Sequence, residues 1–208
     1  MHLVKKKGKD SLDYLIATHN MKKREELQRI LAPLGIRVFI DSEIGISLTD
    51  IEETGTTFEE NALLKASSGC RQSGMPCIAD DSGLCVDALD GRPGVYTARY
   101  CGENTPYPEK MNRLINELDG VPDEKRTAYF VSTIAVCYPD GESFTVRGEC
   151  HGKIGYDMAG ENGFGFDPVF YVGDKSFAQL SKDEKDAVSH RGNSLRKLAL
   201  KLSEEGKL

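Results

Sequence analysis

The segment YLIATHN, residues 14–20, is the best starting point for the fold, because a short apolar run there ends in three polar residues. After it, Leu27, Leu31 and Leu34 recur at helical spacing as far as Gly35. This pattern predicts a strand, a tight turn and a helix. Residues 38–40 follow as a candidate second strand.

The next helix and strand have equally clear signals. Thr57 with Glu60 three residues later forms a capping box, and an apolar stripe continues from it to Gly74. Residues 77–79 are apolar and lead directly into two aspartates, so we expect a buried strand that ends at Asp80 in a polar loop.

The second half of the chain contains longer extended segments. Ser181 with Glu184 forms a second capping box ahead of the C-terminal helical pattern. The expected elements are a helix over 111–118, a hairpin of strands 128–138 and 143–147, a strand over 169–172 and a helix over 195–202. Alternating helices and strands predict an α/β fold with an inserted or appended β region.

Length, composition and net charge indicate which class of protein to expect. The chain has 208 residues, 39% apolar and 29% charged, so we expect one globular domain over residues 13–208 after an N-terminal extension, residues 1–12, expected to be disordered. The formal net charge of −6 argues against a nucleic-acid polymer as partner. The lysine run 5–9 is expected to be a solvated tail without a function.

Location and redox state follow from what the sequence lacks. We recognise no signal peptide and no apolar run long enough to span a membrane, so we expect a cytoplasmic protein. The six cysteines form no Cys-x-x-Cys motif and do not cluster with histidines. We expect them to be reduced thiols, buried or partly buried.

The turn after the first strand could bind an anion. Thr18, Asn20, Lys22 and Lys23 lie where a helix begins, and free backbone N–H groups and the helix dipole attract negative charge there. A phosphate would fit this turn. Equally, Asn20 could simply cap the helix while the lysines remain in solvent.

Two acidic pairs, Glu52 with Glu53 and Asp80 with Asp81, stand ahead of glycine-bearing turns. Carboxylate oxygens suit Mg²⁺, which binds one or two carboxylates together with water and substrate phosphates. Turn capping is the alternative for each pair. Because neighbouring side chains on a strand point to opposite faces, we expect only one of the two aspartates to face a metal and the other to brace the loop.

Two C-terminal motifs could recognise a base. The segment FGFD, residues 164–167, combines aromatic rings with a glycine and a carboxylate, and Ser189, His190 and Arg191 combine a hydroxyl, an imidazole and a guanidinium. Each motif taken alone is more often structural. Their occurrence in one chain with the preceding motifs is more informative.

Taken together, the motifs resemble the inosine triphosphate pyrophosphatase family over nearly the whole chain. They are ATHN at 17–20 with Lys23, EETG-x-TF-x-ENA at 52–62, ADDSGL at 79–84, GRPGVY at 91–96, FGFDP at 164–168 and SHR at 189–191. Two departures stand out: His19 occupies a position where glycine is frequent in the family, and Pro106 and Pro108 lie where relatives often have a more acidic segment.

The resemblance implies a two-lobed mixed α/β fold with a central mixed sheet flanked by helices and a substrate cleft between the lobes. It implies a homodimer that uses Mg²⁺ to hydrolyse XTP, ITP and dITP to the nucleoside monophosphate and pyrophosphate. The implied metal ligands are Glu52 and Asp81, and the implied catalytic residues are Asp81, Lys23 and Lys65. The implied substrate-binding residues are Thr18, His19, Asn20, Met21, Lys22, Lys23, Ser82, Phe164, Gly165, Phe166, Asp167, Lys185, His190 and Arg191.

Two alternatives stay open at this point. One is a pyrophosphatase for other modified nucleotides, and the other is a non-catalytic nucleotide-binding protein. The presence of Glu52, Asp81, Lys23 and Lys65 together argues against a pure binder, which has less need of the full carboxylate set.

Overall fold

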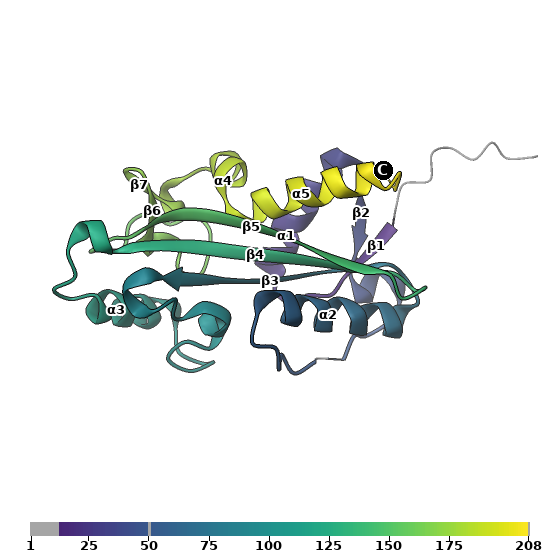
Figure 1. Cartoon of the computed structure of the whole chain (residues 1–208), viewed down its shortest axis with the longest axis horizontal. Helices are drawn as coiled ribbons and strands as arrows, with labels where there is room; N and C mark the ends of the chain where they lie inside the picture. The colour runs from purple at the N-terminus through teal and green to yellow at the C-terminus, as the bar shows by residue number, and fades with distance from the viewer. Residues whose placement is uncertain (1–12, 50, 208) are drawn as a thin grey trace, which may run out of the picture.

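The computed structural model describes residues 13–49 and 51–207, and the N-terminal extension with its lysine run lies outside the described residues. Seven strands form one mixed sheet in the order β2-β1-β3-β4-β5-β6-β7 (Figure 1). β1 pairs in parallel with β2 and β3, and the remaining pairs are antiparallel. The strands are β1 (Asp13–Ile16), β2 (Arg37–Phe39), β3 (Cys77–Val86), β4 (Thr127–Cys137), β5 (Ser143–Ile154), β6 (Phe170–Val172) and β7 (Lys175–Ser176).

Helices cover both faces of this sheet (Figure 1). They are α1 (Met21–Leu31), α2 (Phe58–Ser73), α3 (Tyr107–Glu117), α4 (Lys182–Val188) and α5 (His190–Glu204). The capping box expected at Thr57 is present, and α2 ends at Gly74 in the left-handed conformation, as the sequence predicts. The box at Ser181 begins the short helix α4, and a new cap at Ser189 begins α5.

Side-chain alternation along the strands divides one end of the molecule into two cores. Ile78 packs with Leu27 and Leu195 on the face covered by α1 and α5. Its neighbours Cys77 and Ala79 pack against α2 on the other face. A sheet residue and its sequence neighbour point to opposite faces, which produces this division.

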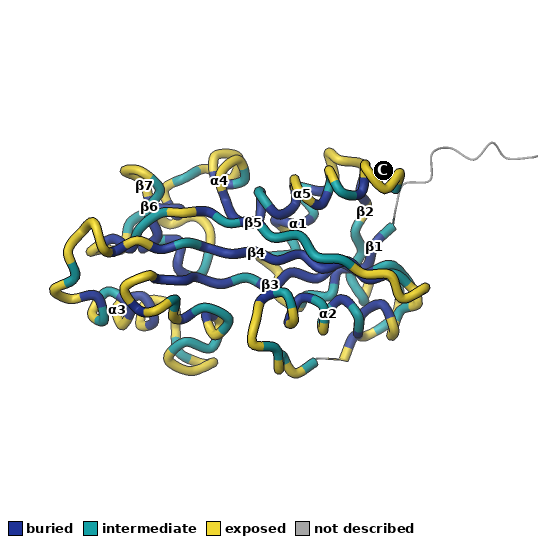
Figure 2. The backbone as a smooth tube through the Cα atoms, viewed as in Figure 1, coloured by how far each residue is buried: buried dark blue, intermediate teal, exposed yellow. Residues whose placement is uncertain are grey.

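The long strands β3, β4 and β5 continue into a second lobe. There Leu84 and Phe130 pack with Leu114 of α3 and with Phe166 and Phe170. Figure 2 shows that β3 and β4 are buried along most of their length, through both lobes. This confirms the expected two-lobed mixed α/β fold.

One sequence-based boundary is wrong in a way that matters for the site. β3 does not end at Asp80 but continues to Val86, with Asp80 opposite Ile134 and Asp81 opposite Thr133 of β4. Pairing with β4 extends the strand through the polar residues. The two aspartates therefore project from the middle of a buried strand instead of from a loop.

The described helices include none with both the length and the apolar character that crossing a membrane would require. All six cysteines are free thiols. Five of them are buried, whereas Cys101 is exposed.

Candidate active site

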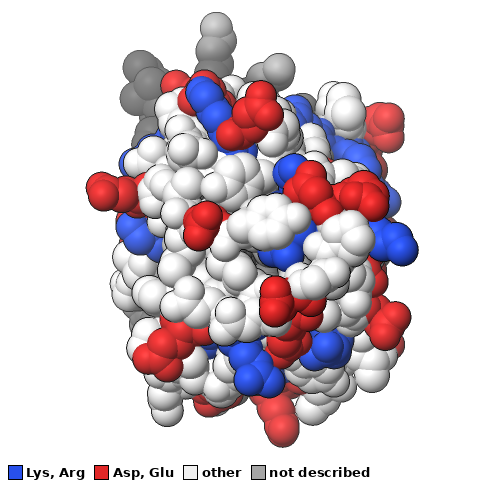
Figure 3. All heavy atoms as spheres, turned by 90° about the vertical axis from the view of Figure 1, so that its left-hand side faces the viewer, with Lys and Arg blue, Asp and Glu red and all other residues white. Residues whose placement is uncertain are grey.

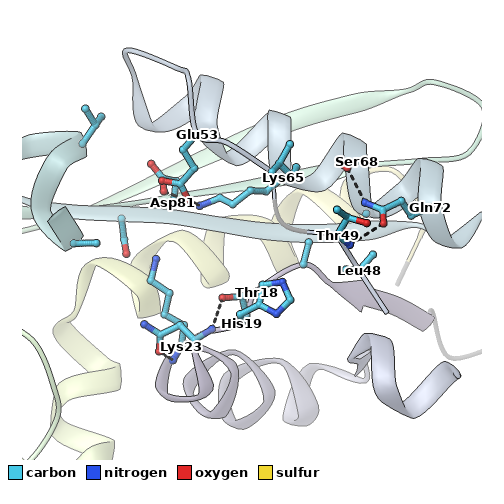
Figure 4. Close-up of a pocket in the computed structure, with 17 residues that line it drawn as sticks. Thr18, His19, Lys23, Leu48, Thr49, Glu53, Lys65, Ser68, Gln72 and Asp81 are labelled. Carbon is cyan, nitrogen blue, oxygen red and sulfur yellow. Dashed lines mark hydrogen bonds and ion pairs between the residues drawn. The ribbon is translucent and has the colours of Figure 1, made fainter. Parts of the chain in front are cut away.

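Two adjoining cavities open beside the middle of β3. The first, here named the lysine cavity, is lined by Lys23, Lys65, Glu53 and Asp81 among others (Figure 4). The second, the aromatic cavity, is lined by Tyr107, Phe130, Phe164, Phe166, Asp167, Lys185, His190 and Arg191 among others. Asn20, Lys23, Ser82 and Ala98 line both cavities, so a single ligand could extend from one into the other.

The turn between β1 and α1 forms one wall of the lysine cavity. Asn20 caps α1, and its Oδ1 accepts hydrogen bonds from the backbone N–H groups of Lys22 and Lys23 at 3.0 and 3.1 Å. The Lys23 side chain is only 16% exposed, and its Nζ lies 2.8 Å from Asp80 Oδ2. The structure therefore combines the capping role of Asn20 with a lysine directed into the site.

The two aspartates point to opposite faces of β3, as predicted. Asp80 is 1% exposed and contacts Lys23 and Arg191 on the α1 and α5 face. Burial acts to raise the Asp80 pKa, but Arg191 and Lys23 hold it well below its usual value. Asp80 therefore holds Lys23 and Arg191 in position through ion pairs.

Asp81 faces α2 and the lysine cavity. Its Oδ1 accepts a hydrogen bond from Lys65 Nζ at 2.7 Å, whereas its buried Oδ2 has no hydrogen-bond partner among the described residues. Burial raises the pKa of Asp81 in spite of the nearby Lys65. A buried carboxylate oxygen without a partner is costly unless a ligand occupies it.

Lys65 on α2 joins two acidic residues. Its Nζ donates to Asp81 and, at 2.9 Å, to Glu53 Oε1, and Figure 4 shows the three side chains converging. Burial acts to lower the Lys65 pKa, but the two carboxylates outweigh it and the pKa is raised. Lys65 is therefore held as a cation between the two carboxylates.

The acidic residue that reaches the cavity is Glu53, not Glu52. Glu53 lines the lysine cavity, whereas Glu52 is exposed and is not among the described lining residues. The segment before α2 has no regular secondary structure, so the sequence carried no periodicity with which to choose between the neighbours. Geometry favours Glu53 over the predicted ligand Glu52.

Buried ion pairs surround the aromatic cavity. Lys185 Nζ lies 2.7 Å from Asp167 Oδ2 and 3.0 Å from Glu26 Oε1, and Glu26 also pairs with Arg191. Arg191 donates in addition to Asp80 and to Ser82 Oγ, which lies 3.0 Å away. These contacts connect α1, β3, α4 and α5 in one network.

The FGFD turn depends on Gly163, the glycine that precedes it. Asp167 Oδ2 accepts the backbone N–H of Phe164 at 2.8 Å, which closes the turn. Gly163 has φ +74°, and a Cβ there would lie 2.0 Å from Asp167 Oδ2. Only glycine permits this approach.

Two buried nitrogen atoms at the aromatic cavity have no protein partner within the described chain. They are Nδ1 of His190 and Nε of Arg191. His190 stacks on Phe130 with ring centroids 4.7 Å apart, and burial, with Arg191 nearby, places its pKa well below the ordinary value. His190 is therefore neutral, and Arg191 Nε remains a donor.

Most of the expected site residues meet at these two cavities, but two others besides Glu52 do not. Met21 is 59% exposed, and neither it nor Lys22 is among the described residues that line either cavity. His19 lines the lysine cavity.

Sequence reasoning missed several residues of the site. Glu26 offered a weak signal, an acidic residue on the same helix stripe as Lys23. Thr49, Ser68 and Gln72 gave none, because their contacts join α2 to an irregular segment: Gln72 Oε1 accepts the Thr49 N–H, and Gln72 Nε2 donates to Ser68 Oγ, both at 2.9 Å.

Known proteins resemble this chain over almost its full length. It is 46% identical to a dITP/XTP pyrophosphatase of Bacillus subtilis, an alignment that covers 89% of this chain and 94% of the relative. It is 48% identical to a dITP/XTP pyrophosphatase of Geobacter sulfurreducens, over 87% of this chain and 92% of that one. Among solved structures, a HAM1 protein from Coxiella burnetii superposes with a TM-score of 0.84 at 38% identity, covering 93% and 99% of the two chains.

The family model described as the Ham1 family matches residues 14–201. This match begins in β1 and ends within α5, so it includes both lobes and every element that lines the two cavities. The resemblance inferred from the motifs is confirmed, and the chain belongs to the Ham1 family.

Proposed function

We propose that this protein hydrolyses the non-standard purine nucleoside triphosphates XTP, ITP and dITP to the nucleoside monophosphate and pyrophosphate. The names of the relatives support the substrate class. The observation that carries the proposal is the continuity of the lysine and aromatic cavities through Lys23 and Ser82. A triphosphate suits the cationic side and a purine suits the aromatic side.

A divalent metal ion is general among pyrophosphatases of this kind, and we propose Mg²⁺. The residues fit it, because Glu53 and the Asp81 Oδ2, which has no partner among residues 13–49 and 51–207, are hard oxygen donors. When bound, the ion would supply charge neutralisation on the phosphates and favour departure of pyrophosphate. Glu53 and Asp81 are the residues that would hold it.

The protein's own groups account for the remaining chemistry. Lys23 and Lys65 bind the phosphate oxygens, while Asp81 orients a water molecule and accepts a proton from it. The water oxygen forms a bond to the α-phosphorus as the bond from that phosphorus to the bridging oxygen breaks, and pyrophosphate leaves.

Base selection belongs to the aromatic cavity. Arg191 Nε is a buried donor without a protein partner in the described chain, so it suits the 6-carbonyl oxygen of hypoxanthine or xanthine. The 6-amino group of adenine would leave that donor unpaired, and a site built for a hydrogen bond strongly rejects such a mismatch. Arg191 therefore acts in the choice between ITP and ATP.

The proposal includes a cytoplasmic homodimer that does not bind nucleic-acid polymers. Its net charge of −6 disfavours phosphate-backbone binding. On the face in Figure 3, basic and acidic side chains are interspersed and form no continuous basic surface among the residues drawn in colour. Light scattering of the purified protein tests the dimer.

The experiment that tests the function is a product analysis. Purified protein is incubated with Mg²⁺ and, separately, with ITP, XTP, dITP, GTP and ATP, and the products are resolved by ion exchange. Monophosphate and pyrophosphate from the first three alone are expected. Orthophosphate, indiscriminate cleavage or tight binding without turnover would contradict the proposal.

A further inference from the structure

Tyr107 lies outside the sequence motifs that define the family. It is the first residue of α3 and stands between Pro106 and Pro108, in the segment that departs from the family pattern. Its side chain lines the aromatic cavity together with the FGFD turn, Lys185 and Arg191. An aromatic ring from the second lobe therefore faces the cavity in which we place the purine.

Exposure distinguishes Tyr107 from other rings of this cavity. Phe166 is 1% exposed and Phe130 is 7% exposed, so both belong to the core. Phe164 lies within 5.0 Å of Lys185 Nζ and 5.9 Å of the Arg191 guanidinium carbon, measured to the ring centroid, so cations occupy part of its surroundings. Tyr107 retains 37% exposure and can offer ring surface to a ligand.

Neighbouring groups hold the Tyr107 ring in place. It meets Phe166 edge-on, with centroids 5.6 Å apart and an interplanar angle of 85°. Lys110 Nζ lies 5.3 Å from its centroid and donates to the carbonyl of Ala98 at 2.6 Å. Pro106 and Pro108 restrict the backbone on either side of the tyrosine.

We propose that Tyr107 is a base-contacting residue whose ring forms part of the wall of the purine site, an inference that rests on the proposed function. Aromatic contact with a base depends little on which base it is, because every base has a π face. Tyr107 therefore contributes affinity for purines in general. Discrimination at the 6-position remains with the hydrogen-bonding nitrogens on α5.

The test compares Tyr107→Leu with Tyr100→Leu. Tyr100 also meets Phe166 edge-on, at 6.0 Å, but is not among the described residues that line the aromatic cavity. If Tyr107 only supported Phe166, the two variants would behave alike. Steady-state kinetics with dITP and with XTP are measured, together with calorimetric binding of the product dIMP and inhibition by pyrophosphate.

Tyr107→Leu is expected to raise KM for dITP and XTP about tenfold and to weaken dIMP binding by a similar factor. The kcat value and the inhibition by pyrophosphate should stay within about twofold of wild type, because the phosphate side is untouched. Tyr107→Phe keeps the ring and should bind dIMP as wild type does. Tyr100→Leu should leave KM unchanged.

Three results would overturn the inference: unchanged KM and dIMP affinity in Tyr107→Leu, equal losses in Tyr107→Leu and Tyr100→Leu, or a full loss in Tyr107→Phe. Failure of the proposed function is separately visible. In that case wild-type protein releases no pyrophosphate from dITP, while the calorimetry still reports whether Tyr107 contacts a purine nucleotide.

Discussion

The lysine cavity and the aromatic cavity contain similar numbers of charged side chains, but the two cavities differ in how completely these charges are paired. Around the aromatic cavity, the charges of Lys185, Glu26, Arg191 and Asp80 are buried and neutralise one another, and in the described structure Arg191 leaves its donor Nε for a ligand. In the lysine cavity, Asp81 keeps one carboxylate oxygen without a partner in the described structure. Charges that satisfy each other build a rigid pocket, whereas an incompletely paired charge remains available to a ligand.

Removing the incompletely paired charge of Asp81 should have the largest effect on activity. We expect Asp81→Asn to reduce kcat by about 10²–10⁴-fold, because the amide cannot accept a proton from water. Thermal unfolding should change little, since Lys65 keeps its contact with Glu53. Pyrophosphate release is the measurement, and near-normal turnover would remove Asp81 from the proton-accepting role.

Disturbing the paired charges should mainly affect stability. Glu26→Gln removes the acidic partner that Lys185 and Arg191 share, and breaking such a buried pair costs about 3 kcal/mol. Denaturant unfolding measures this loss. The matched control is Glu25→Gln, an exposed neighbour on the same helix, which should change the free energy of unfolding by less than about 0.5 kcal/mol.

The ion pairs of Glu26 also predict how the stability of the protein depends on pH. Burial acts to raise the Glu26 pKa, but Arg191 and Lys185 hold it below the ordinary value of 4.5. A carboxyl whose pKa is lowered on folding stabilises the protein above its unfolded pKa, and this contribution is lost as the pH falls through the folded pKa. Wild-type stability should therefore fall below about pH 4.5 more steeply than that of Glu26→Gln. Equal slopes would show that the pair contributes nothing to acid sensitivity.

The smallest expected effect is on the Mg²⁺ requirement, when Glu53 or Glu52 is replaced. Glu53→Gln should raise the Mg²⁺ concentration for half-maximal activity about tenfold, because it removes one of the two carboxylates beside Lys65. Glu52→Gln should behave as wild type, since Glu52 is exposed. A Mg²⁺ titration of the two variants measures this directly. The reverse result would restore Glu52 as the metal ligand.

Local sequence accounts for much of the fold. The first strand and the helix after it, the capping box at Thr57 and the end of α2 at Gly74 all appear, because their signals lie within a few residues of each other. The first α-helix is shorter than expected, since it ends at Leu31 and a 3-10 helix over Ala32–Leu34 continues to Gly35. The alternation of side chains along a strand also predicted that Asp80 and Asp81 face opposite ways. These features need no knowledge of distant contacts.

Tertiary structure alone determined the rest. Pairing with β4 extends β3 past Asp80, through contacts between residues more than forty positions apart in the chain. Glu53 and not Glu52 lies at the cavity because Glu53 accepts a hydrogen bond from Lys65 of α2. The position of Tyr107 follows from the packing of its ring against Phe166 of the FGFD turn. No local periodicity records such contacts, because each joins residues of different elements that meet only when the chain has folded.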